Sequence, residues 1–269
     1  MLPIRFAHPA RRPLAVAALI AIVAFPAVAR GESLTPTCDA PFSMIRFPNP
    51  LTRVAEGLES GKPITIVAIG SSSTAGSGAS SPSAAYPSRL AVELTRRLPG
   101  HPITVLNRGV GGEEVDDMLK RFDTDVIAAK PDLVLWQLGT NSVIRNDKLD
   151  GQDLTIREGI TKIRSTGADA VLIDPQFAPK VIVKPEAIRM VELIASTAKR
   201  EDINLFPRFD LMRRWHDVDH IAFKTFVSPD GLHMNDWSYD CLAKALSVAI
   251  SEAAQRPVLS ARTRLHLVH

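Results

Sequence analysis

Four short polar segments contain the residue types that a nucleophilic site requires. They are Gly70-Ser71-Ser72-Ser73-Thr74, Asn107-Arg108-Gly109-Val110-Gly111-Gly112, Gly139-Thr140-Asn141-Ser142 and Asp230-Gly231-Leu232-His233. The first supplies hydroxyls, the second and third supply N–H donors, and the fourth supplies a carboxylate and an imidazole. A serine hydroxyl attacks a carbonyl only when a base takes its proton, and the oxyanion that forms needs donors. Together the segments make up the parts list of an acyl-transfer site.

Asp230 and His233 are the residues best placed to provide the base. Their spacing within one loop lets the carboxylate orient the imidazole and stabilise its protonated form. An isolated histidine is usually a surface or core residue, and seven occur in this chain. Asp230-Gly231-Leu232-His233 is more specific, because it follows Pro229 and precedes the last predicted helix.

Gly112 and Asn141 are candidate donors to the oxyanion. Gly112 offers a backbone N–H where a side chain would obstruct a substrate, and Asn141 offers a side-chain N–H. Taken alone, each segment has a simpler interpretation. Gly111-Gly112 suits a plain strand-to-helix turn, and the segment around Asn141 suits a helix-capping loop.

The apolar pattern predicts the elements that position these segments. Short apolar runs, typical of strands buried on both faces, alternate with helical patterns. The predicted strands are 64–69, 103–106, 133–138, 170–173 and 203–206, and the predicted helices are 51–59, 85–98, 113–129, 154–165, 185–200 and 237–254. This alternation favours a doubly wound α/β fold with a parallel sheet. Each of the first three polar segments follows a predicted strand, so they should lie together at the carboxyl ends of the strands. Ligands bind beyond these ends in such sheets.

In this order, the four segments resemble the signature blocks of the SGNH (GDSL-type) hydrolase superfamily, over roughly residues 62–255. The resemblance implies a flavodoxin-like three-layer α/β/α sandwich with a five-stranded parallel sheet. It also implies ester hydrolysis without a metal or other cofactor. The residues that it implies are Ser72, Asp230 and His233 for catalysis, and Ser72 N–H, Gly112 and Asn141 for the oxyanion hole.

Ser71 departs from the family pattern, which usually has Asp at this position. The main hypothesis is an exported serine esterase that acts through an acyl-enzyme on Ser72, with a small-molecule or glycan ester as substrate. One alternative is an O-acyltransferase that passes the acyl group to an envelope glycan. The other is a binding module without turnover, for which Ser71 is the argument.

The N-terminus is typical of a secretory signal peptide. Three arginines precede an apolar run, residues 14–29, that ends in Ala27-Val28-Ala29 and is short for a membrane span. An uncleaved anchor is the alternative. We therefore expect a periplasmic or secreted protein with no stable membrane span after cleavage. The predicted organisation is a signal peptide (1–29), an N-terminal arm (30–61), a catalytic domain (62–255) and a C-terminal tail (256–269).

The cysteine content predicts a disulfide, and the charge content argues against a nucleic-acid-binding protein. In an oxidising compartment, Cys38 and Cys241 are expected to form a disulfide, although two buried thiols remain the alternative. Beyond residue 29 the chain has 29 basic and 29 acidic side chains, so its charge does not favour nucleic acid. The glycine spacing near Ser71 matches no nucleotide-binding motif. Nothing in the sequence indicates an oligomeric state.

Overall fold

Five parallel strands form the central sheet in the computed structural model, which describes Pro3 and residues 36–256. Apart from Pro3, the predicted signal peptide lies outside the described residues, as does the tail beyond residue 256. The strands are β1 (Ile64–Gly70), β2 (Ile103–Gly109), β3 (Leu133–Gln137), β4 (Asp169–Ile173) and β5 (Asn204–Phe206).

The strand order is β2-β1-β3-β4-β5, and every neighbouring pair is parallel. The chain runs from β1 outward to β2, crosses back to β3, and then continues to β5. Its direction therefore reverses between β1 and β3, and such a reversal opens a crevice at the carboxyl ends of the two strands. This order confirms the predicted flavodoxin-like α/β fold.

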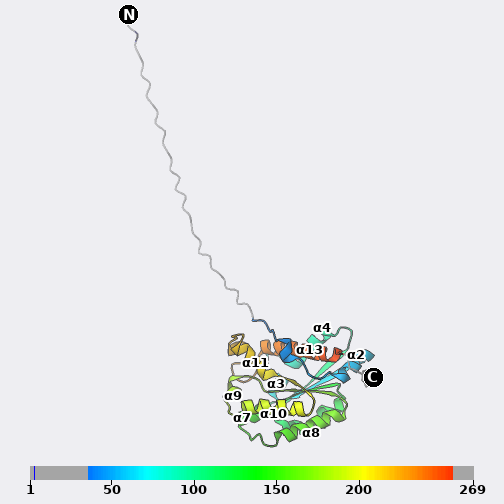
Figure 1. The fold of residues 1–269 in the computed structure, drawn as a ribbon. Coiled ribbons are helices and arrows are strands. Elements are labelled where there is room, and N and C mark those ends of the chain that lie inside the picture. The colour runs from blue at the N-terminus through cyan, green and yellow to red at the C-terminus, as the bar shows by residue number, and fades with distance from the viewer. Residues whose placement is uncertain (1–2, 4–35, 257–269) are drawn as a thin grey trace, which may run out of the picture. The chain divides into compact units, whose positions relative to one another are not determined.

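Helices cover both faces of the sheet (Figure 1). On one face, α4 (Tyr86–Arg97) packs against α13 (Asp236–Gln255), which also contacts α2 (Thr52–Ser60). On the other face, α8 (Gln152–Ser165) packs against α10 (Ala187–Arg200). Both layers bury apolar strand residues, and β3 is buried along its whole length. The shorter described helices include α1 (Phe42–Ile45), α9 (Pro179–Ile182), α12 (Phe223–Phe226) and the 3₁₀ turns η1 (Pro82–Ala84) and η2 (Ile127–Ala129).

The described part of the predicted arm packs against the same core. Phe47, Leu51 and Val54 are buried, and Leu51 N donates a hydrogen bond to Ala253 O of α13, 3.1 Å away. Burial of such side chains stabilises a fold by about 1.5–3 kcal/mol each. Residues 42–60 therefore contribute to the stability of the unit that contains the sheet.

The predicted helix over 113–129 is wrong as a single element. It is divided into α5 (Val115–Lys120), α6 (Phe122–Asp125) and η2, with Arg121 outside helical geometry between the first two. The Arg121 guanidinium donates to both carboxylate oxygens of Glu113, to Asp125, and to Gly70 O at the end of β1. These contacts hold the segment against the sheet. The local apolar pattern of the sequence does not indicate the hydrogen bond from Arg121 to Gly70 O of β1.

Several helices were not predicted, and two of them are longer than a single turn. These two are α7 (Thr140–Arg145), which immediately follows β3, and α11 (Arg208–Asp217), which immediately follows β5. In α11 the apolar residues Phe209, Met212 and Trp215 recur every third position and are buried. That spacing is typical of a helix, so the sequence did contain a signal for α11.

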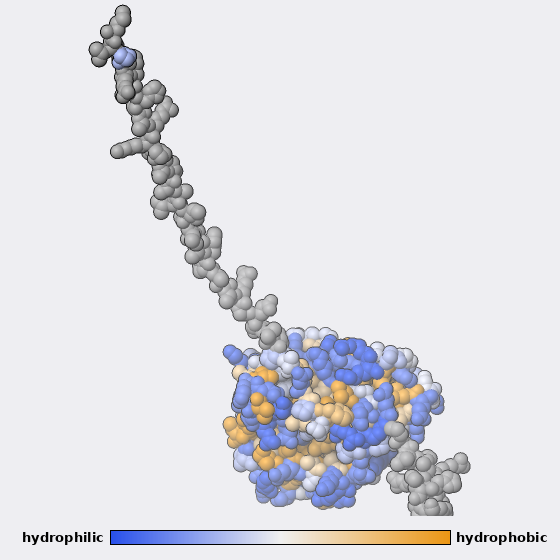
Figure 2. Space-filling model, turned by 45° about the horizontal axis from the view of Figure 1, so that its top comes forward, coloured by the Kyte–Doolittle hydropathy of each residue, from blue (hydrophilic) through white to orange (hydrophobic). Residues whose placement is uncertain are grey.

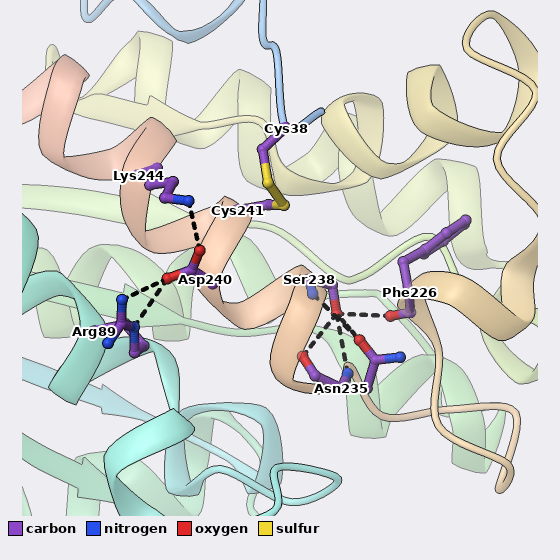
Figure 3. The surroundings of a disulfide bond; sticks show 8 residues. All are labelled: Cys38, Arg89, Phe226, Asn235, Ser238, Asp240, Cys241 and Lys244. Carbon is purple, nitrogen blue, oxygen red and sulfur yellow. Dashed lines mark hydrogen bonds and ion pairs between the residues drawn. A yellow bond between two sulfur atoms is a disulfide. The ribbon is translucent and has the colours of Figure 1, made fainter. Parts of the chain in front are cut away.

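The predicted disulfide between Cys38 and Cys241 is present (Figure 3). The two Cα atoms are 5.2 Å apart, and the bridge joins the N-terminal segment to α13. One residue before Cys241, Asp240 binds Arg89 of α4 and Lys244 (Figure 3). The disulfide is therefore attached to α13, a helix that an ion pair also links to α4.

Replacing both Cys38 and Cys241 with Ser is expected to lower the free energy of unfolding. The bridge joins residues 203 positions apart, and the chain-entropy model gives a loop of that size up to about 5 kcal/mol. Urea unfolding of the oxidised wild type and of the double variant measures the difference. Adding a reductant should bring the wild type to the stability of the variant, and equal stability before reduction would contradict this account.

The described surface is mainly hydrophilic on the face that Figure 2 shows, where hydrophobic residues form separate small patches. Within residues 36–256, no helix is both long enough and apolar enough to cross a bilayer.

Candidate active site

The first polar segment forms a tight corner directly after β1. Ser71 caps α3 (Ser72–Ala75), a single helical turn in which Thr74 N donates to Ser71 O at 3.0 Å. Gly70 leaves no room for a side chain, because a Cβ there would lie 2.3 Å from Thr74 Oγ1. The corner places Ser72 at the carboxyl end of β1 with its side chain partly exposed.

Ser71 is buried, and both its N–H and its hydroxyl are hydrogen-bonded, although the SGNH family pattern usually has Asp at this position. Its N–H and its hydroxyl donate to Gln137 Oε1, at 2.9 and 3.0 Å, and Thr74 Oγ1 donates to the same oxygen at 3.3 Å. Gln137 is the last residue of β3 and is completely buried. A neutral amide oxygen therefore anchors this turn through three donors, whereas the Nε2 group of the same Gln137 side chain is buried without a hydrogen-bond partner.

Ser72, His233 and Asp230 form a continuous hydrogen-bonded chain. Ser72 Oγ lies 2.8 Å from His233 Nε2, and His233 Nδ1 lies 2.5 Å from Asp230 Oδ2. A carboxylate beside Nδ1 favours the tautomer that is protonated there, which leaves Nε2 free to accept the serine proton. The geometry is therefore able to activate the Ser72 hydroxyl as a nucleophile.

Hydrogen bonds stabilise the ionised form of the Asp230 carboxylate. Its Oδ1 accepts from the N–H groups of Leu232 and His233, at 2.9 and 3.0 Å. Partial burial raises the pKa of Asp230, but the hydrogen bonds from His233 and from these two N–H groups outweigh it and hold the pKa below its usual value. The acid that orients His233 is thus charged across the neutral pH range.

The loop that carries Asp230 and His233 is closed at its base. Val227 and Met234 form an antiparallel bridge, and Ser228 N donates to His233 O at 2.8 Å. These contacts fix the direction in which the His233 side chain leaves the loop. Such rigidity matters because a catalytic base must stay within hydrogen-bond reach of its partner.

Gln176, which follows β4, ties this loop to the third polar segment. Its Nε2 donates to Leu232 O at 3.3 Å, and its Oε1 accepts from Thr140 Oγ1 at 2.9 Å. Lys180 N of α9 donates to Gly231 O at 3.0 Å. The fourth segment, far away in sequence, is therefore held against the same rim of the sheet.

The third segment binds the residue that follows the second segment, beside Ser72. Asn141 Nδ2 donates to Glu113 O at 2.8 Å, and its amide carries a second N–H. Gly112 has φ 82°, a conformation that favours glycine. A Cβ at Gly111 would lie 3.9 Å from the Cβ of Ser72, so the turn borders the serine. All the predicted residues thus gather at the carboxyl ends of β1, β2 and β3.

Two arginines hold the Gly111-Gly112 turn in place. Arg145 of α7 donates from Nη2 to Gly112 O at 2.7 Å and forms an ion pair with Glu114. Arg121 binds the side chain of Glu113, at 2.6 Å between Nη2 and Oε2. These contacts from Arg145 and Arg121 fix the conformation of the turn.

Sequence reasoning missed two buried polar side chains, Gln137 and Arg208, behind the turn that carries Ser72. Gln137 interrupts the apolar run 133–138, and a polar residue inside a buried strand is a signal that was available. Arg208 begins α11 and is also completely buried. No local pattern in the sequence indicates that an arginine at a helix start turns inward.

A sequence model of the non-GDSL lipase-like family matches residues 37–256, which is most of the chain. The chain belongs to this family. That description agrees with Ser71 at the position where GDSL has Asp. It also confirms the resemblance to SGNH-type hydrolases, which rested on four short segments.

Individual relatives agree with this family. An arylesterase from Vibrio mimicus is 24% identical over 135 residues, which are 50% of this chain and 63% of that protein. A two-domain esterase active on acetylated mannans has a TM-score of 0.67 at 19% identity, over 78% of this chain and 55% of that one. The chain thus spans less than two thirds of either protein.

Two smaller structures share the fold over nearly their full length. An acetylxylan esterase from Geobacillus stearothermophilus has a TM-score of 0.60 at 20% identity, over 70% of this chain and 94% of that one. A lipolytic protein of the G-D-S-L family from Desulfitobacterium hafniense has a TM-score of 0.59 at 23% identity, over 69% and 98%. The family match therefore places the chain among SGNH-type, lipase-like proteins, and the solved structures share its fold.

Proposed function

We propose that this protein is an exported serine esterase that hydrolyses carboxylic esters through an acyl-enzyme on Ser72. The observation that carries the proposal is the chain of hydrogen bonds from Ser72 Oγ through His233 to Asp230, at 2.8 and 2.5 Å. Such a chain supplies a nucleophile, its base and the group that orients the base.

In the first half of the reaction, Ser72 Oγ attacks the ester carbonyl while His233 Nε2 takes its proton. The imidazolium is stabilised by the charged Asp230, and it then protonates the departing alcohol as the tetrahedral intermediate collapses. The acyl group is left on Ser72. In the second half, His233 takes a proton from water, the hydroxide attacks the acyl carbonyl, and the proton returns to Ser72 Oγ as the acid leaves.

The oxyanion of both tetrahedral intermediates is assigned to Ser72 N–H, Gly112 N–H and Asn141 Nδ2. The hydrogen bond between Asn141 and Glu113 O supports this assignment, because it fixes the amide plane while leaving one N–H unused. The bond from Arg145 to Gly112 O supports it too, since it orients the glycine turn. Donors that are fixed in advance need no reorganisation in the transition state.

Replacing Asn141 with Ala is expected to lower kcat by roughly 10²–10³-fold, because one donor to the oxyanion is lost. KM should change much less, since the donor acts mainly on the intermediate. Steady-state kinetics with p-nitrophenyl acetate measures both. Asn146→Gly, at the residue that caps the same helix with φ 60°, is the matched control, because glycine accepts this conformation. An Asn141→Ala variant with unchanged kcat would remove this residue from the oxyanion hole.

The substrate is proposed to be a short-chain, acetyl-type ester carried by a glycan. The support is that two structural neighbours are esterases of acetylated mannans and of acetylxylan. The predicted signal peptide and the Cys38–Cys241 disulfide support an extracytoplasmic location, where such glycans occur.

Hydrolysis of p-nitrophenyl acetate, butyrate and octanoate by the intact protein tests this proposal. We expect turnover that decreases as the acyl chain lengthens, and release of acetate from acetylated mannan or xylan. Product analysis with a glycan acceptor present distinguishes the acyltransferase, which would form acylated sugar in place of free acid. Binding of glycan without any ester cleavage would instead identify a binding module and contradict the esterase.

A further inference from the structure

The most unusual charge in the described core is that of Arg208, which lies behind the turn that carries Ser72, residues 71–75. Its side chain is completely buried at the start of α11. The Nε group donates to Asp174 O at 2.8 Å, and Nη1 donates to Ser73 Oγ at 2.9 Å. Nη2 is buried and has no hydrogen-bond partner. Burying a charged arginine costs free energy, so its presence here suggests that the side chain has a role that offsets this cost.

Among residues 36–256, no carboxylate lies within ion-pair distance of this guanidinium. The nearby Asp174 carboxyl accepts from Phe209 N at 2.8 Å instead. Burial raises the pKa of Asp174 to about 7, so it neutralises the arginine only in part. Burial also lowers the pKa of Arg208, to about 10, which still leaves it protonated at neutral pH.

Arg208 joins the ends of strands that are not neighbours in the sheet. Asp174 follows β4, Ser73 lies in the turn after β1, and β3 runs between these two strands. Gln137 at the end of β3 holds the same turn through Ser71 and Thr74. The residues on either side of Ser72 are therefore held by two buried side chains, one from β3 and one from α11.

The position of the cation also matters for the chemistry. Ser73 directly follows Ser72, whose N–H is assigned to the oxyanion, so a positive charge lies just behind the atoms that become negative. A charge in a buried, low-dielectric environment acts more strongly than the same charge in water. A buried cation that is only partly neutralised favours the tetrahedral anion over the uncharged ester.

We propose that Arg208 is a positioning residue for Ser72, and that its buried positive charge favours the anionic intermediate of the reaction. The proposal rests on the proposed esterase function. Arg208 does not touch the substrate. It acts through Ser73, which fixes the turn, and through its electric field.

Three substitutions separate these roles. Arg208→Met removes charge and hydrogen bonds, Arg208→Lys keeps the charge, and Ser73→Ala removes the link to the turn while Arg208 stays. We expect Arg208→Met to lower kcat roughly tenfold to a hundredfold with little change in KM, as small displacements near a reacting group do. Arg208→Lys should recover part of this loss, and Ser73→Ala should lose less than Arg208→Met. Arg97→Met, at the other end of the fold, is the matched control.

Binding of phenylboronic acid gives a readout that a purely structural role would not move, because it forms a tetrahedral anion on an active serine. Its affinity should fall by the same factor as kcat in Arg208→Met, and recover in Arg208→Lys. A folded Arg208→Met variant with wild-type kcat and boronate affinity would overturn the proposal. So would an Arg208→Lys variant no better than Arg208→Met.

Separate control measurements distinguish a loss of folding from a loss of activity. If Arg208→Met does not fold, as judged by its thermal transition, the kcat values of Ser73→Ala and Arg208→Lys test the proposal instead. A wild-type kcat in a folded Ser73→Ala variant overturns the positioning role. A wild type that hydrolyses no ester and is not labelled by a fluorophosphonate overturns the esterase function and this proposal with it. An active wild type beside an equally active Arg208→Met variant overturns only the role of Arg208.

Discussion

Replacing Ser72 with Ala is expected to lower kcat for p-nitrophenyl acetate by roughly 10⁵–10⁶-fold. The variant has no hydroxyl at the position 2.8 Å from His233 Nε2, so no acyl-enzyme can form. The oxyanion donors remain, and they account for a small residual rate above that of water. KM should change little, because only one oxygen atom is removed from the binding surface.

The matched control is Ser165→Ala, which makes the same chemical change at the end of α8. The Ser165 hydroxyl donates only to Lys162 O, at 2.7 Å, and kcat should stay within about twofold. The double variant Ser72→Ala/His233→Ala should be no slower than Ser72→Ala, because residues that act as one unit are not additive. A folded Ser72→Ala variant with substantial turnover would transfer the nucleophile to another residue.

Replacing Asp230 with Asn is expected to lower kcat by roughly 10⁴-fold, the loss seen when the acid of a serine-protease triad becomes an amide. The asparagine oxygen can still accept from the N–H groups of Leu232 and His233, so the loop keeps its shape. Its NH₂ group then faces His233 Nδ1 and favours the tautomer protonated on Nε2. That tautomer cannot accept the proton of Ser72.

Asp217→Asn is the matched control, since Asp217 Oδ1 lies 2.8 Å from His216 Nδ1 on the surface and has no link to Ser72. Its kcat should equal that of the wild type. Because hydrogen bonds hold the pKa of Asp230 below its usual value, the wild type should lose no activity through protonation of Asp230 between about pH 6 and pH 8. A folded Asp230→Asn variant within tenfold of the wild type would show that His233 needs no orienting carboxylate.

The sheet could be predicted from the sequence because its signal is local. Each strand is a short apolar run, and runs buried on both faces alternate with amphipathic helices, as in β3 and α8. Helices between successive strands make those strands parallel, and the right-handed crossovers set the face that each helix covers. The helix over 113–129 was wrong because the chain leaves helical geometry at Arg121, which also binds Gly70 O, 51 residues away in sequence. Contacts of that kind leave no local pattern.

The predicted site residues are adjacent in the structure, whereas their supports were not foreseen. Ser72, Asp230 and His233 were chosen from short motifs, and the structure brings them within hydrogen-bond distance. The doubt raised by Ser71 has a physical answer, since Gln137 Oε1 accepts both of its hydrogen bonds. That partner lies 66 residues away, so only the folded sheet reveals it.

Mapping the covalent adduct of a fluorophosphonate tests the central claim most directly. The intact wild-type protein is labelled, digested and analysed by mass spectrometry, beside the Ser72→Ala variant. The account predicts a single adduct, on the peptide that contains Ser72 and at Ser72 itself, and no adduct in the variant. An adduct on a different serine, or a folded wild type that hydrolyses esters without being labelled at Ser72, would contradict it.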